Sequence, residues 1–390
     1  MAFRKIRMLT AGESHGPALT VILEGLPAQL MVSREKLQQQ MRRRQLGYGR
    51  GGRMKIETDE VEVTSGLRGG ITLGSPISIV IRNQDFAHWQ DVMDPWLKSS
   101  DPKRAVSRPR PGHADLAGGL KYGEKDLRSI LERASARETA ARTAAGALCR
   151  QFLEEAGIDI GSHVLSIGRV ALAERNVEWE RIIAVQGSEV LRCADPETEK
   201  LMIEEIEEAM RRKETVGGTF EVVARNVPPG LGSHVQWDQK LDGRIAQAFL
   251  SIPAVKGVWL GDALEQAHGW GSAAHDEIFY EKDRGFFRRT NRAGGLEGGI
   301  TNGEEIRVRA AMKPLSTLMK PLQSVDVISK ERQEAIVERS DVCSVPAAAI
   351  VAEAMLALVL ADALLEKFSS DSMPEFLAAL HHYLQRLSNY

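Results

Sequence analysis

The chain has 390 residues, of which 43% are hydrophobic and 27% charged, and its formal net charge is −2. These values are typical of a globular protein with a large core, and they give no global reason to expect nucleic acid as a partner. The three cysteines are far apart and odd in number. They argue against a disulfide framework and a CxxC metal site, and they fit a reducing compartment.

The first feature along the chain is the segment TAGESHGPALT at 10–20, where Ser14 and His15 lie between two glycines. Glycine and proline disfavour strand and helix here, so we predict a loop whose backbone is approached closely. The segment is not a nucleophile elbow, and adjacent side chains rarely meet as a serine–histidine pair, which disfavours a serine nucleophile. No apolar segment follows the basic N-terminus, so we expect no signal peptide.

Capping residues and periodicity predict helices at 33–45, where Ser33 is the N-cap, and at 196–214. The second is strongly charged and is expected to be an amphipathic surface helix. Its predicted apolar side consists of Leu201, Met202, Ile206 and Met210.

Two more helices are predicted further along. Residues 135–157 begin with Ser135 and Glu138 in the spacing of a capping box, and Gly157 suits the end of that helix. Residues 345–368 are almost wholly apolar, but Glu353 and Asp362 interrupt them. We therefore predict a buried core helix and not a membrane span.

An internal repeat relates GLRGGITLGSPI at 66–77 to GLEGGITNGEEI at 295–306. Each copy precedes an alternating run, SIVIRN or RVRAAM, that predicts a strand, and MKIETDEVEV, GTFEVVARNV and GVWL show further strand patterns. Two distant copies of one turn-plus-strand unit indicate a pseudo-symmetric fold of mixed helices and antiparallel strands. Chance recurrence of a glycine turn is the alternative.

Basic residues dominate two segments, 34–55 and KRAVSRPRPGH at 103–113. They form a solvated basic face, an RNA surface or a pocket for a small polyanion. An RNA surface needs aromatic side chains for stacking, and only Tyr48 is nearby. Arginine forks with intervening glycines favour the polyanion pocket.

Candidate reactive groups lie in irregular segments. His15 and His113 occupy glycine- and proline-rich loops, and a proton donor beside arginines suits expulsion of phosphate. Ser135, between Arg133 and Arg137, is a helix cap whose free N–H groups attract anions.

Near the C-terminus Arg339 and Asp341 precede the apolar helix, and Asp341 is either a local cap or a functional acid. The loop MKPLSTLMKP at 312–321 also suits an anion. No spacing of metal ligands is present.

The chain resembles the chorismate synthase family in motifs that occur in family order from the first loop to the C-terminal helix and cover nearly the whole chain. These motifs are GESHG, RRRQLGYGRGGRM, RPRPGHADLAG, RASARETAARTAAGA, LEGGITNGEEI, MKPLSTL and RSDVCSVPAAAIVAEAML. The resemblance implies the α+β class. A single domain over residues 1–390 would form a β-α-β sandwich with an internal pseudo-two-fold repeat and antiparallel sheets around core helices.

The resemblance also implies a carbon–oxygen lyase that converts 5-enolpyruvylshikimate 3-phosphate to chorismate and phosphate by anti-1,4-elimination. This is the last step of the shikimate pathway toward aromatic amino acids. It would use reduced FMN without net redox change, in a cytoplasmic homotetramer with no nucleic-acid or membrane partner. An outside source of reduced flavin is expected, and intrinsic NAD(P)H-dependent reduction stays open. The rivals are a nucleic-acid-binding protein using 34–55 and a phosphatase or serine hydrolase built on GESHG.

By resemblance, His15 protonates the leaving phosphate and Ser14 positions it, His113 donates toward the reduced flavin, and Asp341 relays a proton from flavin N5. Ser135 is the remaining residue expected to act in catalysis. Substrate anions would be bound by Arg44, Arg50, Arg110, Arg137 and Arg339. Flavin contacts would come from Arg133, Ala134, Ser135, Ala254, Gly298, Lys313, Pro314, Leu315, Ser316, Thr317 and Arg339. Pro253 departs from the family pattern, which usually has Asn there, and it offers neither an N–H nor an amide.

Overall fold

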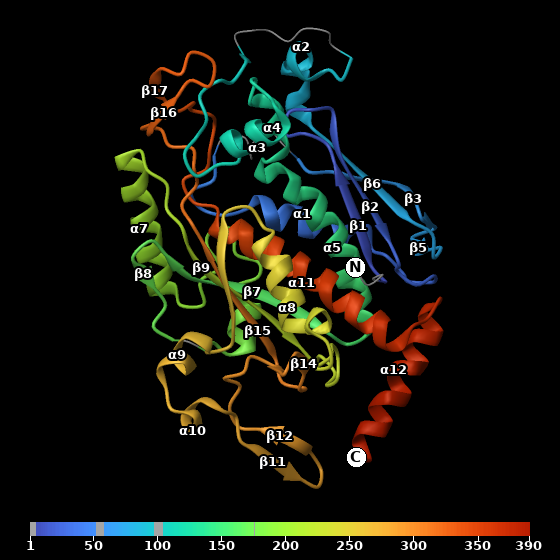
Figure 1. The fold of residues 1–390 in the computed structure, drawn as a ribbon. Helices are drawn as coiled ribbons and strands as arrows, with labels where there is room; N and C mark the ends of the chain where they lie inside the picture. Colours follow the sequence, from blue (N-terminus) through green and yellow to red (C-terminus); the bar gives the residue numbers. More distant parts are fainter. Residues whose placement is uncertain (1–4, 52–57, 97–103, 175) are drawn as a thin grey trace.

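A computed structural model describes residues 5–51, 58–96, 104–174 and 176–390. Parts of the basic segments and of the predicted strand MKIETDEVEV, at residues 52–57 and Lys103, lie outside the described residues. The described elements form three layers, with helices between two antiparallel sheets (Figure 1). The predicted sandwich of sheets around core helices is confirmed.

The first sheet has the order β1-β2-β6-β3, formed by β1 (Arg7–Ala11), β2 (Ala18–Glu24), β6 (Ile77–Arg82) and β3 (Val61–Ser65). The second has the order β10-β15-β9-β7-β8, formed by β10 (Val255–Leu260), β15 (Ile306–Met312), β9 (Gly218–Arg225), β7 (Asp159–Ile167) and β8 (Val170–Ala171). Apolar residues alternate along β2, so that Leu19, Val21 and Leu23 are buried toward the helices.

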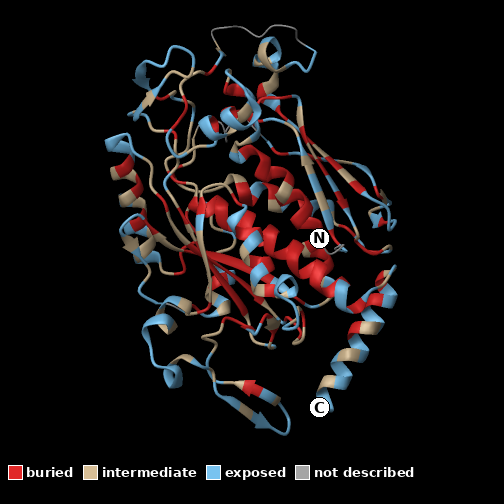
Figure 2. Cartoon of the chain, viewed as in Figure 1, coloured by how far each residue is buried: buried red, intermediate tan, exposed pale blue. Residues whose placement is uncertain are grey.

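The central layer contains four helices: α1 (Arg34–Gln45), α5 (Thr139–Glu155), α8 (Leu241–Leu250) and α11 (Val345–Phe368). Figure 2 shows α5 and α11 as the most buried helices. Their axes approach closely because Gly146 faces Ala354, and a Cβ at Gly146 would lie 2.4 Å from the Cβ of Ala354. Small residues at this crossing therefore allow α5 and α11 to pack closely against each other.

The remaining elements cover the edges of these layers or connect them. The helices are α2 (Gln90–Met93), α3 (Asp115–Tyr122), α4 (Arg128–Arg133), α6 (Trp179–Ala184), α7 (Pro196–Arg212), α9 (Ala263–His268), α10 (Gly271–Ala274) and α12 (Met373–Ser388), with 3-10 turns η2 (Gln84–His88), η4 (Ala136–Glu138) and η5 (Trp237–Gln239). The short strand pairs are β4 (Leu67–Arg68) with β5 (Ile71–Thr72), β11 (Ile278–Glu281) with β12 (Gly285–Arg288), β13 (Leu296–Glu297) with β14 (Ile300–Thr301), and β16 (Gln323–Val325) with β17 (Arg332–Glu334).

The sequence repeat reflects a repeat of topology. In sheet order, strands β1-β2-β6-β3 correspond to β7-β9-β15-β10. In chain order, the equivalent strands β2 and β9 are followed by helices α1 and α8, and the equivalent strands β6 and β15 lead to the central helices α5 and α11. The hairpin β4–β5 corresponds to β13–β14. The predicted pseudo-symmetric fold is therefore confirmed.

The two hairpins also share one side-chain device. The Thr72 hydroxyl donates to the carbonyl of Pro27 at 2.6 Å and accepts from the N–H of Leu30 at 2.9 Å. The Thr301 hydroxyl makes the same pair of bonds, to the carbonyl of Pro228 at 2.7 Å and from the N–H of Leu231 at 2.8 Å. The shared Gly-Gly-Ile-Thr sequence thus anchors each hairpin to its own half, which excludes chance recurrence of a glycine turn.

Two helix predictions need correction. The predicted capping box at 135–157 is wrong, because Ser135 caps the 3-10 turn η4 and the Glu138 carboxylate instead pairs with Arg142 at 2.8 Å. In α7 the buried residues are Met202, Ile206 and Ala209, whereas Leu201 and Met210 are exposed. By contrast, the Ser33 hydroxyl caps α1 as predicted, by accepting from the N–H of Lys36.

The acidic residues of α11 explain why this apolar helix stays in the core. By length and composition α11 could cross a membrane, but its most apolar window is wholly buried inside the protein. Glu353 accepts hydrogen bonds from Arg43 of α1, and Asp362 pairs with Arg244 of α8. The predicted core helix is thus joined by a buried ion pair to each half of the repeat.

Glu353 gives an expected dependence of stability on pH. Burial alone would raise the pKa of Glu353, but the charges of Arg43 and Arg150 and the hydrogen bond from Ser162 lower it to about 2, from 4.5. A carboxyl whose folded pKa is depressed stabilises the fold above its unfolded pKa, and this stabilisation is lost as the pH falls from about 4.5 toward 2. We expect E353Q to weaken this acid sensitivity and, because buried arginines lose their counter-charge, to lower stability at pH 7 by about 3–5 kcal/mol.

Denaturant unfolding of wild type and E353Q between pH 7 and pH 3 measures both effects. Glu24→Gln is the matched control, because Glu24 forms an exposed ion pair with Arg7. Parallel pH curves for wild type and E353Q would assign the acid sensitivity to other carboxyls.

Candidate active site

A cavity of about 390 Å³ opens where five connecting segments meet. These are the β1–β2 loop, the residues that follow α1, the long β6–α5 connection, the α8–β10 turn and the β15–α11 connection. The site therefore lies where the pseudo-symmetric halves join. Except for the β1–β2 loop, these connecting segments begin or end at the central helices. Its volume is in the range of pockets for small ligands.

Most of the predicted site residues line this cavity: Ser14, His15, Arg44, Arg50, Arg110, His113, Ala134, Ser135, Arg137, Ala254, Lys313, Leu315, Ser316, Thr317, Arg339 and Asp341. Three predicted flavin contacts lie outside the lining. The exposed Arg133 guanidinium donates to the carbonyls of Thr10 and Gly12, so it braces the first loop. Pro314 is exposed between lining residues, and Gly298 is exposed in the β13–β14 turn.

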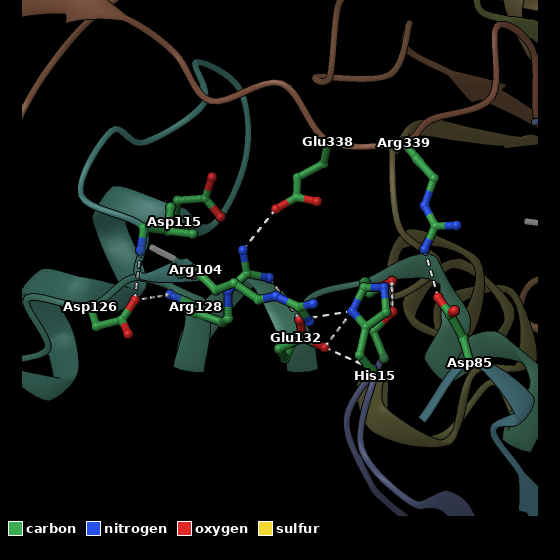
Figure 3. A network of polar contacts seen from close by, with 12 residues as sticks. His15, Asp85, Arg104, Asp115, Asp126, Arg128, Glu132, Glu338 and Arg339 are labelled. Carbon is green, nitrogen blue, oxygen red and sulfur yellow. Dashed lines mark hydrogen bonds and ion pairs between the residues drawn. The ribbon is translucent and has the colours of Figure 1, made fainter. Parts of the chain in front are cut away.

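His15 is held on two sides, and Figure 3 shows Glu132 on one of them. Its Nδ1 lies 2.9 Å from Oε1 of Glu132 on α4, and its ring stacks on Trp89 with centroids 4.1 Å apart. The neighbouring Ser14 hydroxyl is hydrogen-bonded at 3.0 Å to the hydroxyl of Ser135. The predicted proton donor and the predicted cap therefore belong to one wall of the cavity.

His113 has a similar acidic partner. Its Nδ1 lies 2.6 Å from Oδ1 of Asp115, the fully buried first residue of α3, and Arg110 Nε donates to Oδ2 of Asp115 at 2.8 Å. Burial alone would raise the pKa of Asp115, but hydrogen bonds from His113 and Arg110 hold it well below its ordinary value. Arg110 also donates to the Thr317 hydroxyl at 2.9 Å, which joins the connections of the two halves.

Arg44 and Arg137 converge on one buried carboxylate, that of Asp59. Burial would raise the pKa of Asp59, but the charges of the two arginines lower it. Two cations share a single anion, so this cluster carries an excess positive charge at the cavity wall. The Nε of Arg44 is also buried without a hydrogen-bond partner among the described residues. Such a group is suited to an incoming anion.

Asp341 and Arg50 form a second charged pair. Asp341 Oδ2 lies 2.8 Å from Arg50, and the carboxylate accepts from the N–H of Gly51 and the hydroxyl of Ser344, both at 2.6 Å. Burial lowers the pKa of Arg50, and the charge of Asp341 opposes this effect. Arg339 differs, because its side chain is 54% exposed and pairs with Asp85 at 2.6 Å.

Pro253, the residue that departs from the family pattern, also lines the cavity. The N–H of Val255 donates to the carbonyl of Ile252 at 3.1 Å, and Ala254 has φ 67°. This is the arrangement of a type II turn, in which proline suits the second position and a positive φ is required at the third. Pro253 therefore fixes the turn that presents Ala254, although it has no amide to offer.

Sequence reasoning missed the acids that hold these cations and histidines. Asp115 lies two residues after His113, and Glu132 directly precedes the Arg133–Ser135 segment, so their proximity to predicted residues was a usable signal. Asp59 gave no such signal, because it is one of several acids in a strand-like segment and nothing in the sequence distinguishes it from the others. No cluster of metal-binding side chains occurs among the described residues.

The fold is of the α+β class, and its cavity brings together arginines, histidines and a carboxylate, a set of groups suited to a small anionic ligand. Comparisons with known proteins identify the family. The chorismate synthase family profile matches residues 6–365. Chorismate synthase of Moorella thermoacetica is 56% identical over 98% of this chain and 100% of its own length. That of Aquifex aeolicus is 52% identical over 100% of both chains.

A crystal structure of chorismate synthase superimposes with a TM-score of 0.81 and 44% identity, and 100% of each chain is covered. The chain therefore belongs to the chorismate synthase family. Membership makes it a lyase of the shikimate pathway that acts on a small molecule and needs a flavin. The comparisons do not support the nucleic-acid interpretation of residues 34–55, or the hydrolase interpretation of GESHG.

Proposed function

We propose that this chain converts 5-enolpyruvylshikimate 3-phosphate to chorismate and phosphate by anti-1,4-elimination. The observation that carries this proposal is the meeting of His15, His113 and Asp341 with the Arg44–Arg137 pair in one cavity. The substrate has a phosphate and two carboxylates, so it needs several cations. The reaction needs a group that protonates phosphate and a group that accepts a proton, and the cavity offers both.

We further propose reduced FMN as the flavin. Lys313 and Ser316, whose Nζ and Oγ are 2.9 Å apart, form a cationic and hydroxyl-bearing wall suited to a phosphate. Ala134, Ala254 and Leu315 supply apolar wall beside it. These residues fit a flavin phosphate and ring. When bound, the reduced flavin lends electron density as the phosphate leaves and recovers it afterwards, so the reaction has no net redox change.

The chain's own groups then have separate tasks. Arg44, Arg137 and Arg110 would bind and orient the anionic groups, and Arg50 would hold the carboxylate of Asp341 in place through their ion pair. His15 would donate a proton from Nε2 to the departing phosphate, because its Nδ1 is occupied by Glu132. His113 would present its Nε2 in the same way, and Asp341 would accept a proton at its carboxylate. The hydroxyls of Ser14 and Ser135 would position the phosphate.

The wider setting is also a proposal. We expect residues 1–390 to act as one domain, in a cytoplasmic homotetramer that receives reduced flavin from outside, with no nucleic-acid or membrane partner. Pro314, Gly298 and Arg133 stay predicted flavin contacts, although they lie outside this lining.

An anaerobic assay tests the function directly. Pure protein is mixed with 5-enolpyruvylshikimate 3-phosphate and FMN, with and without dithionite, and chorismate and phosphate are followed together. Equal formation of both products, only with reduced flavin, is the expected result. Phosphate without chorismate would indicate a phosphatase. No product and no FMN binding would overturn the proposal.

A further inference from the structure

We propose that Glu132 is the positioning residue for His15, holding the proton-transferring Nε2 toward the cavity, and that Trp89 supports the face of the ring. This proposal rests on the proposed function only in giving His15 the role of proton donor. The pairing itself is a property of the ligand-free protein.

Glu132 contacts both the ring and the backbone of His15. Both oxygens of its fully buried carboxylate reach His15 Nδ1, at 2.9 and 3.0 Å, and Oε2 also accepts from the N–H of His15 at 2.8 Å. The carbonyl of Glu132 accepts from the N–H of Ser14 at 3.0 Å. One residue at the end of α4 thus fixes both the loop and the orientation of the imidazole.

This contact decides which nitrogen carries out proton transfer. A carboxylate is only an acceptor, so Nδ1 must carry a proton whether the ring is neutral or charged. Nε2 is then the nitrogen that gains and loses a proton. An adjacent negative charge favours the imidazolium, which is the form that donates. The Trp89 ring, stacked at 4.1 Å, favours the same cation through its face.

Glu132 is kept ionised for this purpose. Burial alone would raise the pKa of Glu132, but the hydrogen bond and charge of His15, and the charge of Arg128, lower it. Arg128 lies 3.2 Å from Oε1 of Glu132 and 3.0 Å from Glu338, so its single charge is divided between two carboxylates. Glu132 therefore retains negative charge for His15.

The other charged groups near His15 lie on both sides of it (Figure 3). Arg104 and Arg128 lie 4.5 and 5.0 Å from the centroid of the Trp89 ring. The pair Arg339–Asp85 lies on the opposite side of the histidine from Arg128. Among the acids of this group, Glu132 is the one with a hydrogen bond to the ring. Its removal is therefore expected to affect the proton on His15 more than removal of Glu338 or Asp85.

A purely structural role for Glu132 makes a different prediction. Glutamine can still accept the N–H bond of His15, so E132Q keeps the loop anchor and removes the charge. If Glu132 only anchors the loop, E132Q should therefore leave the pH dependence of kcat unchanged. If Glu132 supports the imidazolium of His15, E132Q should change it.

The test measures the pH dependence of kcat for wild type, E132Q, E132D and Glu338→Gln, with melting temperatures in parallel. We expect E132Q, which removes the negative charge beside the imidazole, to move the alkaline limb of kcat to lower pH. E132D keeps the negative charge, so its alkaline limb should lie close to that of wild type. Glu338→Gln is the comparison variant, since it removes the second acid on Arg128 without touching His15, and it should move the limb by much less than E132Q does. An unmoved limb in folded E132Q would overturn the proposal.

A second measurement needs no turnover and does not depend on E132Q. The ¹⁵N resonances of His15 in the ligand-free wild type, assigned with His15→Asn, should show a protonated Nδ1 at every pH at which the protein is folded. A neutral ring protonated at Nε2 would overturn the proposal even if E132Q does not fold. If wild type makes no chorismate, the proposed function fails, while these resonances still decide whether Glu132 holds the ring.

Discussion

Replacing His15 with alanine is expected to reduce chorismate formation by a factor of about 10² or more, a loss typical of removing a general acid. The reason is local, because the remaining cations can bind phosphate but only a proton donor neutralises it as the C–O bond breaks. His15 supplies that donor at Nε2, with Nδ1 tied to Glu132. Single-turnover chorismate formation under anaerobic conditions with reduced FMN measures the loss.

Two comparisons make this result specific. FMN binding, followed by flavin fluorescence, should be retained in His15→Ala, since the proposed flavin wall is built from Lys313, Ser316 and their neighbours. His88→Ala is the matched control, because His88 lies next to the stacking Trp89 but its side chain is 78% exposed and outside the cavity lining. Turnover at the wild-type rate in His15→Ala would remove its assigned proton role.

The frame of the fold could be predicted from sequence wherever a local pattern matched the tertiary packing. The Gly-Gly-Ile-Thr repeat has this property, because Thr72 and Thr301 make equivalent bonds within their own halves. The apolar run of α11 also predicted a core helix. The capping box failed because Glu138 found a stronger partner in Arg142, a contact one helical turn away that competes with the cap.

The residues of the site also divide into those that local sequence could predict and those that it could not. Both histidines and several of the cations could be predicted because they occur in irregular, glycine-rich segments, where a polar side chain has no packing role. Arg44 is different, because it lies in α1. Their acidic partners could not, because pairing is decided in three dimensions. Asp59 meets Arg44 of α1 and Arg137 of η4 only in the folded protein, because the three residues are far apart in the sequence. Buried cations need counter-charges, so each basic loop implied an acid without indicating which one.

The second large effect is expected for Asp341→Asn, which keeps the size of the side chain but removes its capacity to accept a proton at neutral pH. We expect a loss of chorismate formation of about 10² or more, because the proposed proton acceptor is removed while substrate binding is largely kept. The KM should change less than kcat, since Arg50 and Ser344 retain a polar partner at residue 341.

The variant Ser344→Ala tests whether Asp341 is a proton acceptor in catalysis or only a local helix cap. It removes one of the hydrogen bonds to the carboxylate, that from the Ser344 hydroxyl at 2.6 Å, and leaves the charge and the Arg50 pair in place. If Asp341 acts as a proton acceptor, the kcat of Ser344→Ala should fall by a factor of about ten at most. If Asp341 only orders the start of α11, Ser344→Ala and Asp341→Asn should lower the melting temperature alike and leave kcat within about threefold of wild type. Steady-state kinetics and thermal unfolding of the two variants, measured with saturating reduced FMN, therefore separate a proton acceptor from a helix-capping acid.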